Sequence, residues 1–500
     1  MLEVKNLDIT INERFLVKDL TFTLQQNDKL AVIGEEGNGK STLLKVLAGK
    51  GDYATISGSI NYHRHTVGYL PQSIDSSDNN KSVFDYLFID THDYYNKVND
   101  LYKHLNSLCI DENILNQNIT TLSGGEKVKI GILKLLLKDY DILLLDEPTN
   151  DLDIETLKWL EELIRTINKP LMYVSHDETL LANTANAILH LEQIQKKTAC
   201  RYTLSKTDYD TYINKRLKAI DRQIQISQSE KRDFKKKQAK LNQIMQKVEY
   251  QQNTISRGDP HTAAVLKKKM HSLKSQERKM NNAELTSMPD LEERINFSFE
   301  QAVIPKNKII IDLDIPELKV GDKLLAKNIK LNIKGKQHLC IIGKNGVGKS
   351  TLIKLIYENL KDRTDILVGY MPQNYNDIFE KYVYVADFIC PNKNKDDLTK
   401  AKTYLGNMKF TREEMNGQIK DLSNGTKAKL FLIKFVLNKY NVLILDEPTR
   451  NVSPLSNPVI RKALADYTGT IISVSHDRKY IAEVIDSLYV LNENGLKKEM

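Results

Sequence analysis

The sequence lacks any long uninterrupted apolar run, and among its 500 residues it has only four cysteines and one tryptophan. Its apolar stretches are short and broken by charge, as in ILKLLL at residues 132–137. A membrane-spanning helix needs about 20 nearly continuous apolar residues. The first residues, MLEVK, do not follow the basic-then-apolar pattern of a secretory signal. We therefore expect no membrane segment and a cytoplasmic protein.

Closely spaced metal ligands are also missing. The cysteines are far apart in the sequence, at Cys109, Cys200, Cys340 and Cys390. Structural zinc sites normally use closely spaced pairs of ligands, and the ten histidines are scattered as well. We expect buried free thiols and no structural zinc. With 41% apolar and 28% charged residues, the chain has the composition of a globular protein that can bury sizeable cores.

Four segments occur twice, in the same order. The copies are GEEGNGKS at 34–41 and GKNGVGKS at 343–350, LSGG at 122–125 and LSNG at 422–425, DEPT at 146–149 and 446–449, and VSHD at 174–177 and 474–477. Such spacing predicts one duplicated unit of about 200 residues. We expect a first domain at residues 1–205, a second domain at residues 296–500, and a unique segment at 206–295 between them.

Each repeat has apolar runs that lead into the repeated segments. Residues 30–33 and 339–342 precede the glycine-rich segments, and residues 141–145 and 442–445 precede the acidic pairs. Runs that are apolar on both faces are typical of buried parallel strands. The repeats are therefore predicted to be α/β domains that bind ligands at the carboxyl ends of their strands.

The segment at 206–295 is of another kind. It holds 20 Lys and Arg against 12 Asp and Glu, a net charge of 20 − 12 = +8. Apolar residues keep one heptad phase at positions 213, 217, 220, 224, 234, 241, 245, 248 and 255, and a second phase at 263, 266, 270, 273 and 280. Asp259 and Pro260 between the phases are suited to start a helix. The pattern predicts a long antiparallel α-hairpin with a narrow apolar seam; a solvated charged linker is the alternative.

The glycine-rich segments have the pattern of phosphate-binding loops. Their backbone N–H groups and the following helix start would attract phosphate, Lys40 and Lys349 would reach the β- and γ-phosphates, and Ser41 and Ser350 would ligate Mg²⁺. The predicted loop residues are Gly34, Glu35, Glu36, Gly37, Asn38, Gly39, Lys40, Ser41 and Thr42, and Gly343, Lys344, Asn345, Gly346, Val347, Gly348, Lys349, Ser350 and Thr351.

Acidic pairs end the neighbouring strands. Asp146 and Asp446 are placed to hold Mg²⁺ through water, and Glu147 and Glu447 follow directly. We expect these two glutamates to position and polarise the attacking water. ATP and Mg²⁺ are thus the predicted ligands.

With these motifs the sequence resembles the ABC ATPases and, more narrowly, the ABC-F proteins, along nearly its whole length. LSGGE at 122–126 is similar to the family signature, which completes the nucleotide site of the opposite domain. The resemblance implies that Phe15 contacts adenine and that the chain is a monomer whose two domains pair with each other. Further implied are Ser423, Asn424 and Gly425 at the first site, Ser123, Gly124 and Gly125 at the second, Gln72 and Gln373 near Mg²⁺, and the histidines His176 and His476 at the γ-phosphate.

Several residues depart from the family pattern. Leu324 stands where Phe15 stands in the first domain, Glu36 replaces the usual Asn, and Thr426 replaces the Glu of the signature. Residues 450–453 (RNVS) do not match the family loop that contacts the partner domain, whereas residues 150–153 (NDLD) do. We predict two unequal sites that both bind ATP.

The ABC-F resemblance implies a ribosomal role. In that family the linker between the domains enters the ribosomal E site, beside P-site tRNA and large-subunit rRNA. The basic residues predicted to face RNA phosphates are Lys235, Lys236, Lys237, Arg257, Lys267, Lys268 and Lys269. Protection from antibiotics of the peptidyl-transferase centre (lincosamides, pleuromutilins, streptogramin A) is favoured. A housekeeping factor for stalled ribosomes and the ATPase subunit of a transporter are the alternatives.

Overall fold

A computed structural model describes residues 1–11, 13–75, 78–88, 94–108, 110–194, 199–254, 260–281, 297–299, 304–391 and 395–499. It contains two compact units. One combines residues 1–209 with 292–500, and the other spans residues 210–291. The first unit therefore includes both predicted ATPase domains, and the second contains most of the predicted hairpin. The predicted boundary at 295–296 lies outside the described residues.

The first domain is built on a six-stranded sheet in the order β5-β6-β7-β3-β8-β9. These strands are β3 (Lys29–Ile33), β5 (Val67–Leu70), β6 (Ile142–Asp146), β7 (Leu171–Val174), β8 (Ala187–Ile194) and β9 (Ala199–Ser205). All neighbours pair in parallel except β8 and β9. Every residue of β3, β6 and β7 is buried, as the continuous apolar runs predict.

A second, antiparallel sheet packs on this domain in the order β2-β1-β4. Its strands are β1 (Leu2–Ile11), β2 (Arg14–Leu24) and β4 (Thr55–Asn61). The apolar faces of β1 and β2 share one core with helix α1 (Lys40–Leu47) and with β3. This core supports the base of the first phosphate loop, which connects β3 to α1.

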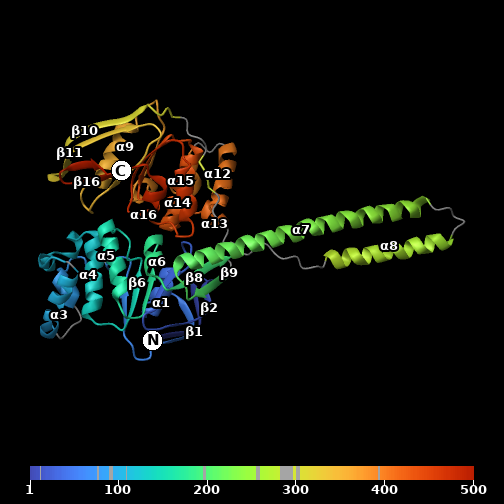
Figure 1. The fold of residues 1–500 in the computed structure, drawn as a ribbon, viewed down its shortest axis with the longest axis horizontal. Coiled ribbons are helices and arrows are strands. Elements are labelled where there is room, and N and C mark those ends of the chain that lie inside the picture. The colour runs from blue at the N-terminus through green and yellow to red at the C-terminus, as the bar shows by residue number, and fades with distance from the viewer. Residues whose placement is uncertain are drawn as a thin grey trace. The chain divides into compact units, whose positions relative to one another are not determined.

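Helices and short 3₁₀ turns complete the first domain (Figure 1). They are α2 (Val83–Phe88), α3 (Tyr94–Ser107), η2 (Glu112–Asn116), η3 (Ile119–Thr121), α4 (Gly124–Leu137), α5 (Ile154–Thr166) and α6 (Glu178–Thr184). Helices α2, α3 and α4 contribute to a separate apolar core. That core positions the start of α4, where the signature segment lies.

The second domain repeats this plan. Its six-stranded sheet has the order β13-β14-β15-β12-β16-β17, and an antiparallel pair β10-β11 takes the place of the smaller sheet. The strands are β10 (Ile309–Val320), β11 (Lys323–Lys334), β12 (His338–Ile342), β13 (Val368–Met371), β14 (Val442–Asp446), β15 (Thr470–Val474), β16 (Ser487–Asn492) and β17 (Gly495–Lys498). Matching strand orders in the two halves agree with duplication of one α/β unit.

The helices of the second domain occupy equivalent places in the sequence. They are α9 (Lys349–Leu360), α10 (Asn376–Phe379), α11 (Val385–Ile389), α12 (Lys395–Asn407), α13 (Arg412–Asn416), η4 (Ile419–Asp421), α14 (Asn424–Leu437), α15 (Asn457–Ala465) and α16 (Arg478–Val484). Two apolar cores hold them, one around α9 and the other around α14.

The hairpin consists of α7 (Tyr209–Thr254) and α8 (Pro260–Asn281), which run side by side (Figure 1). At 1.5 Å per residue these helices are about 70 Å and about 33 Å long. Leu241, Val248, Leu266 and Leu273 form a buried seam, with Ile244, Met245 and Met270 packed against it. The heptad pattern predicted six of these seven positions.

The seam does not extend along all of α7. Leu217, which the heptads place in it, is 40% exposed. Helix α8 has 22 residues against 46 in α7, so only part of α7 has α8 beside it. The helix break falls where the sequence predicts it, because α8 begins at Pro260. The proposed cap, Asp259, lies outside the described residues.

No helix in the described part of the chain is long and apolar enough to cross a membrane. Three cysteines are free thiols. Cys340 and Cys390 are buried as expected, whereas Cys200 is only half-buried because it lies on the edge strand β9. Cys109 is outside the described residues.

Candidate nucleotide sites

Each phosphate loop joins a buried strand to a helix. The first runs from β3 to α1 and the second from β12 to α9. The residues that precede these helices, Gly39 and Gly348, have φ values of 87° and 102°. This left-handed conformation strains residues with a side chain and favours glycine. The glycine spacing therefore follows from the backbone path that lets N–H groups face one point.

The loop lysines lie inside their loops. Lys40 Nζ donates to the carbonyl oxygens of Gly34 (2.8 Å) and Glu35 (3.0 Å). Lys349 Nζ donates to Gly343 O (2.8 Å) and in the same way to Lys344 O (2.9 Å). Both side chains are buried. Each ammonium group is thus held against two backbone carbonyls of its own loop, where a bound phosphate would contact it.

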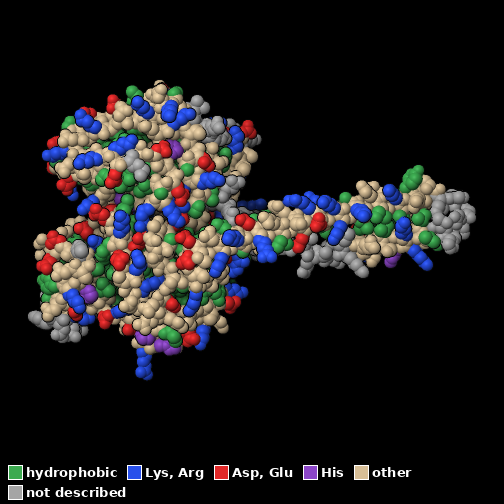
Figure 2. Space-filling model, viewed as in Figure 1, with side chains coloured by type: hydrophobic (Ala, Val, Ile, Leu, Met, Phe, Trp, Pro, Cys, Tyr) green, Lys and Arg blue, Asp and Glu red, His purple; other side chains and the backbone are tan. Residues whose placement is uncertain are grey.

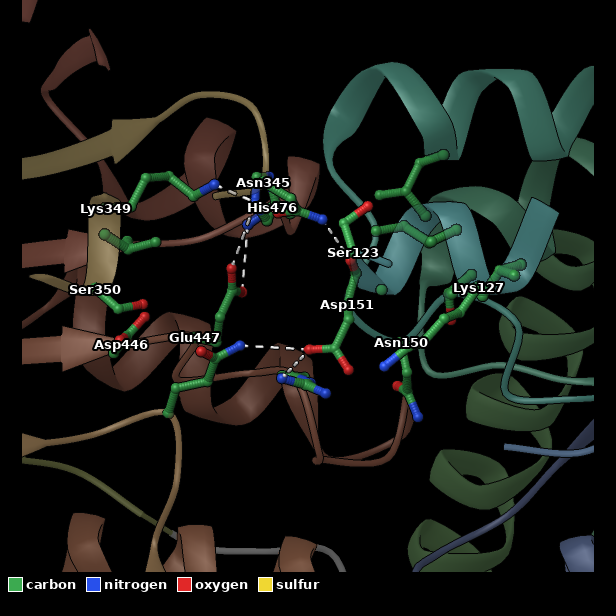
Figure 3. A pocket seen from close by; sticks show the side chains of 18 of the residues that line it. Ser123, Lys127, Asn150, Asp151, Asn345, Lys349, Ser350, Asp446, Glu447 and His476 are labelled. Atoms are coloured by element: carbon green, nitrogen blue, oxygen red, sulfur yellow. Dashed lines mark hydrogen bonds and ion pairs between the residues drawn. The ribbon is translucent and has the colours of Figure 1, made fainter. Parts of the chain in front are cut away.

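The residues predicted to hold Mg²⁺ meet at the strand ends. Ser41 Oγ lies 2.8 Å from Asp146 Oδ1, and Tyr69 donates to Asp146 Oδ2 at 3.0 Å. In the second site, Ser350 and Asp446 lie next to each other (Figure 3). Asp446 Oδ1 is buried and has no hydrogen-bond partner. Such an orphaned oxygen fits a hydrated Mg²⁺, since this ion takes oxygen ligands and keeps several waters.

Glu147 is held by three polar side chains. Its carboxylate accepts hydrogen bonds from Gln72 Nε2 (2.8 Å) and Asn150 Nδ2 (2.7 Å), and its Oε1 lies 3.2 Å from His176 Nε2. Burial raises the pKa of Glu147, but the bonds from His176 and Asn150 outweigh burial and lower the pKa to about 2. The carboxylate is therefore ionised at neutral pH.

Glu447 has a different environment. Its Oε2 accepts only weak bonds, from the His476 backbone N–H (3.3 Å) and Ser475 Oγ (3.4 Å). Burial and the neighbouring Asp446 raise the pKa of Glu447 to about 8. Burial and nearby Lys349 lower the pKa of His476 to about 4. The two candidate bases therefore have pKa values shifted in opposite directions; that the two sites are unequal and both bind ATP stays a prediction.

Both candidate bases share an uncommon backbone conformation. Glu147 has φ 49° and Glu447 has φ 56°, in the left-handed region. A non-glycine residue pays a steric cost there of about 1–2 kcal/mol. Such strain is often concentrated at functional sites.

The signature segments start helices. Ser123 caps α4 by accepting a bond from the Glu126 N–H, and the Glu126 carboxylate in turn accepts a bond from the Ser123 N–H. Ser423 caps α14 by accepting a bond from the Thr426 N–H at 3.2 Å. Thr426 has no carboxylate to complete the reciprocal pair, although its hydroxyl lies 2.8 Å from Ser423 Oγ. Both starts direct helix N–H groups outward, as an anion site requires.

The second site opens into a cavity of about 700 Å³. Figure 3 shows Lys349 and Ser350 on one side of it and Ser123 on the other. The remaining predicted residues that line it are Gly124, Asn345, Gly346, Gly348, Thr351, Gln373, Asp446, Glu447 and His476, together with Gln72 and His176. The structure therefore brings the second phosphate loop and the first signature together. No residue of the first phosphate loop lines this cavity among the residues the structure describes.

Contacts between the domains frame both sites. Asn345 Nδ2 donates to Asp151 O at 2.5 Å, and Arg450 Nη1 lies 2.7 Å from Asp151 Oδ1. His176 Nδ1 lies 3.0 Å from Val452 O. The segment at 450–453 therefore reaches the opposite domain even though its sequence departs from the family pattern.

Other predicted residues lie at the surface. Phe15 is 44% exposed and Leu324 is 40% exposed, so an adenine contact at Phe15 stays a prediction. The lysines at 235–237 and 267–269 are exposed on the hairpin, where Figure 2 shows basic side chains along the helices. Arg257 lies outside the described residues.

The sequence analysis missed several residues at these sites. Tyr69, which contacts Asp146, carried no motif signal. Lys429, Ser453 and Ser456 contact the first phosphate loop from the second domain. One signal was available: Glu36 stands in place of the Asn345 of the second loop, and a buried carboxylate requires a basic partner.

Two phosphate loops on parallel sheets, each beside a strand-end Asp-Glu pair and facing a signature helix of the opposite domain, define a tandem P-loop ATPase. The family model described as ABC transporter matches residues 17–150 and 326–450. The chain belongs to the ABC transporter family of ATP-binding proteins, and it is ABC-F-like. It is accordingly an ATP hydrolase, and membership implies ATP bound with Mg²⁺.

The chain is similar to relatives along nearly its whole length. It is 30% identical over 516 residues to ATP-binding protein Uup of Buchnera aphidicola, covering 99% of this chain and 81% of the relative. It is 26% identical to ribosome protection protein VmlR of Bacillus subtilis, covering 99% of this chain and 87% of the relative. The fold matches an archaeal ribosome recycling factor, aABCE1, with TM-score 0.63 at 18% identity, covering 99% of this chain and 89% of that one.

Proposed function

We propose that this protein is a cytoplasmic, ATP-driven ribosome factor that enters the E site and protects the ribosome from antibiotics bound at the peptidyl-transferase centre. The observation that carries the proposal is a basic α-hairpin inserted between two ATPase domains. A relative of similar length is named a ribosome protection protein, and 99% of this chain aligns with it.

The hairpin has the chemistry of an RNA-binding element. Its segment at 206–295 carries a net charge of +8, and its lysines at 235–237 and 267–269 are exposed. RNA phosphates attract such clusters, and binding releases condensed counterions. Structured RNA is recognised largely by shape, so a stiff charged rod needs no base-specific contacts. Large-subunit rRNA and P-site tRNA are the partners we propose.

The ATPase sites would control this binding. Lys40 and Lys349 would contact the phosphates, and Ser41, Ser350, Asp146 and Asp446 would hold Mg²⁺, which neutralises charge on the transferred phosphoryl group. Glu147 and Glu447 would orient the attacking water. Contacts that ATP makes only when the two domains are paired would stabilise the paired state. Hydrolysis would remove these contacts and let the domains separate.

A double variant tests the ribosomal role. Glu147→Gln with Glu447→Gln removes both candidate bases but keeps their size. We expect ATP to trap this variant on ribosomes, so that it sediments with them and inhibits translation. Glu162→Gln, at a 69% exposed glutamate of α5 that pairs, among the described residues, only with Arg165 of the same helix, is the matched control and should behave like the parent protein. No ATP-dependent cosedimentation of the trapped variant would refute a ribosomal role, and copurification with a membrane protein would favour a transporter.

A second test separates protection from housekeeping. Expression in a susceptible bacterium should raise resistance only to drugs of the peptidyl-transferase centre. Replacing Lys235–Lys237 and Lys267–Lys269 with Gln should abolish this resistance and reduce the salt dependence of ribosome binding by about one unit of slope per lost phosphate contact. Uniform sensitivity with retained ribosome binding would identify the housekeeping role instead.

A further inference from the structure

The first phosphate loop carries two carboxylates that the second loop lacks. Glu35 and Glu36 occupy the positions that Lys344 and Asn345 occupy in the second loop. A carboxylate in a phosphate loop repels the ligand that the loop is built to attract, unless a cation neutralises it. The structure shows which groups neutralise this pair.

Both carboxylates bind the second domain. Glu36 Oε2 lies 3.1 Å from Lys429 Nζ, and Glu36 Oε1 accepts a hydrogen bond from the Ser453 backbone N–H at 2.5 Å. Glu35 Oε2 lies 3.3 Å from the same Lys429 Nζ, and Glu35 Oε1 accepts a bond from Ser456 Oγ at 2.6 Å. Each of the four carboxylate oxygens therefore has a partner across the domain boundary.

The side chains that make these contacts are buried. The side chains of Glu35 and Glu36 are each 9% exposed, and that of Lys429 is 7% exposed. Burial lowers the pKa of Lys429, but Glu36 and Glu35 outweigh it and raise that pKa above its usual range. Burial raises the pKa of Glu35, but Lys429, Lys409 and the bonds from Ser456 and Ser453 together outweigh burial and lower that pKa. Charged groups that are buried and hydrogen-bonded to each other interact more strongly than exposed pairs.

The packing at this point is close. A Cβ atom added to Gly425, in the second signature, would lie 2.4 Å from both Glu36 Cγ of the first loop and the backbone oxygen of Asn451 in its own domain. A Cβ atom added to the equivalent Gly125 would have Thr156 Oγ1 as its nearest neighbour, at an ordinary contact distance of 3.5 Å. The first loop thus touches its signature segment directly through Glu36. The second loop meets the first domain through Asn345, which contacts Asp151 and Asp153, and it borders the open cavity together with the first signature.

The other ion pairs between the two domains have their acidic and basic partners arranged in the same way. Wherever the structure records an ion pair between the described residues of the two domains, the acid belongs to the first domain and the base to the second. Examples are Glu178 with Arg461 and Asp177 with Arg478. Two copies of the first domain would place acids against acids. The boundary therefore favours pairing of unlike domains, as charge complementarity does in other interfaces.

We propose that Glu35 and Glu36 form an interdomain clasp with Lys429, Ser453 and Ser456 that joins the first phosphate loop to the second domain without nucleotide. The second site then opens and closes around ATP while the first site stays joined. The clasp is independent of what the protein binds outside its own chain, so a failed ribosome experiment leaves it intact.

Amide hydrogen exchange of the full-length, nucleotide-free protein tests the clasp. We expect residues 34–41 and 450–456 to exchange on the order of tenfold more slowly, after correction for intrinsic rates, than the equivalent residues 343–350 and 150–156. The Ser453 amide, which donates to Glu36, is the most direct reporter. Addition of ATP should slow exchange more at the second site than at the first, because the clasp already slows exchange at the first site.

Three variants complete the experiment. Glu36→Asn installs the residue of the second loop. Lys429→Met removes the cation that contacts both carboxylates and leaves only Lys409, 4.0 Å from Glu35 Oε1. Both variants should reduce the difference in exchange between the sites. Lys129→Met is the matched control, because Lys129 is the equivalent lysine of the first signature helix and lies over the Trp159 ring, 5.2 Å from its centroid. It should leave the difference unchanged. Equal exchange at both sites in the parent protein, or an unaltered difference in a folded Glu36→Asn variant, would overturn the proposal.

Discussion

Replacing Arg461 with Met should destabilise the paired domains more than any exposed charge substitution. Arg461 is 3% exposed on α15 and contacts Glu178, the first residue of α6, through both guanidinium ends, at 2.5 and 3.3 Å. Met fills a similar volume but leaves the buried Glu178 carboxylate with Lys479 alone, at 3.1 Å. Breaking a buried, hydrogen-bonded ion pair typically costs about 3–5 kcal/mol. We take about 3 kcal/mol here, because Lys479 remains.

Differential scanning calorimetry measures this effect as a change in Tm. For a domain of about 200 residues, a loss of about 3 kcal/mol in stability lowers Tm by roughly 6–12 °C. Lys330→Met is the control, because Lys330 and its partner Asp314 are 76% and 65% exposed. An exposed pair contributes at most about 1 kcal/mol.

A double variant distinguishes the loss of the ion pair from the cost of leaving the Glu178 carboxylate buried without Arg461. Glu178→Leu with Arg461→Met removes both charges, and we expect it to regain much of the Tm lost in Arg461→Met, since replacing a whole buried pair by apolar groups is often neutral. A Tm for Arg461→Met equal to that of Lys330→Met would refute the reasoning. So would a double variant less stable than either single one.

Three further results are expected. Gly425→Ala should open the first site in nucleotide-free protein, seen as faster amide exchange at residues 34–41, because the added Cβ would clash with Glu36 Cγ of the first loop as well as with Asn451 O. Gly125→Ala creates no such clash and should not open the second site further. Leu273→Ala should cost the hairpin about 2 kcal/mol, measured by urea unfolding followed by far-UV circular dichroism; a loss below about 0.5 kcal/mol would show that the seam contributes little. Burial raises the pKa of Cys340 to about 12 and also raises that of Cys200. Since the thiolate is the reactive form, a thiol reagent at pH 8 should label the half-buried Cys200 and leave Cys340 unlabelled until the protein unfolds, as mass spectrometry of the labelled peptides would show.

The fold could be predicted from the sequence because its signals are local. Continuous apolar runs identify β3 and β12, and the glycine spacing of each phosphate loop reflects left-handed backbone angles. Heptads identify the seam of the hairpin because each apolar position depends on its near neighbours. Leu217 was placed wrongly in that seam, since heptad phase does not reveal where a partner helix ends.

Contacts between distant segments could not be predicted in the same way. Lys429 lies 393 residues from Glu36, and nothing in its local sequence shows which acid it faces. The difference between Glu147 and Glu447 was equally hidden, because the two share the DEPT motif and differ only in the polar groups around them. One part of the candidate site was accessible to sequence: Glu36 and Thr426 marked the places where the two halves diverge.

The left-handed backbone at Glu147 and Glu447 has a consequence for laboratory evolution. Glycine and, to a lesser degree, asparagine tolerate this conformation better than glutamate does. A screen that rewards heat resistance alone should therefore enrich such replacements at these positions. The selected variants would be more heat-stable but would no longer hydrolyse ATP. Thermal selection of this protein therefore requires a parallel ATPase assay.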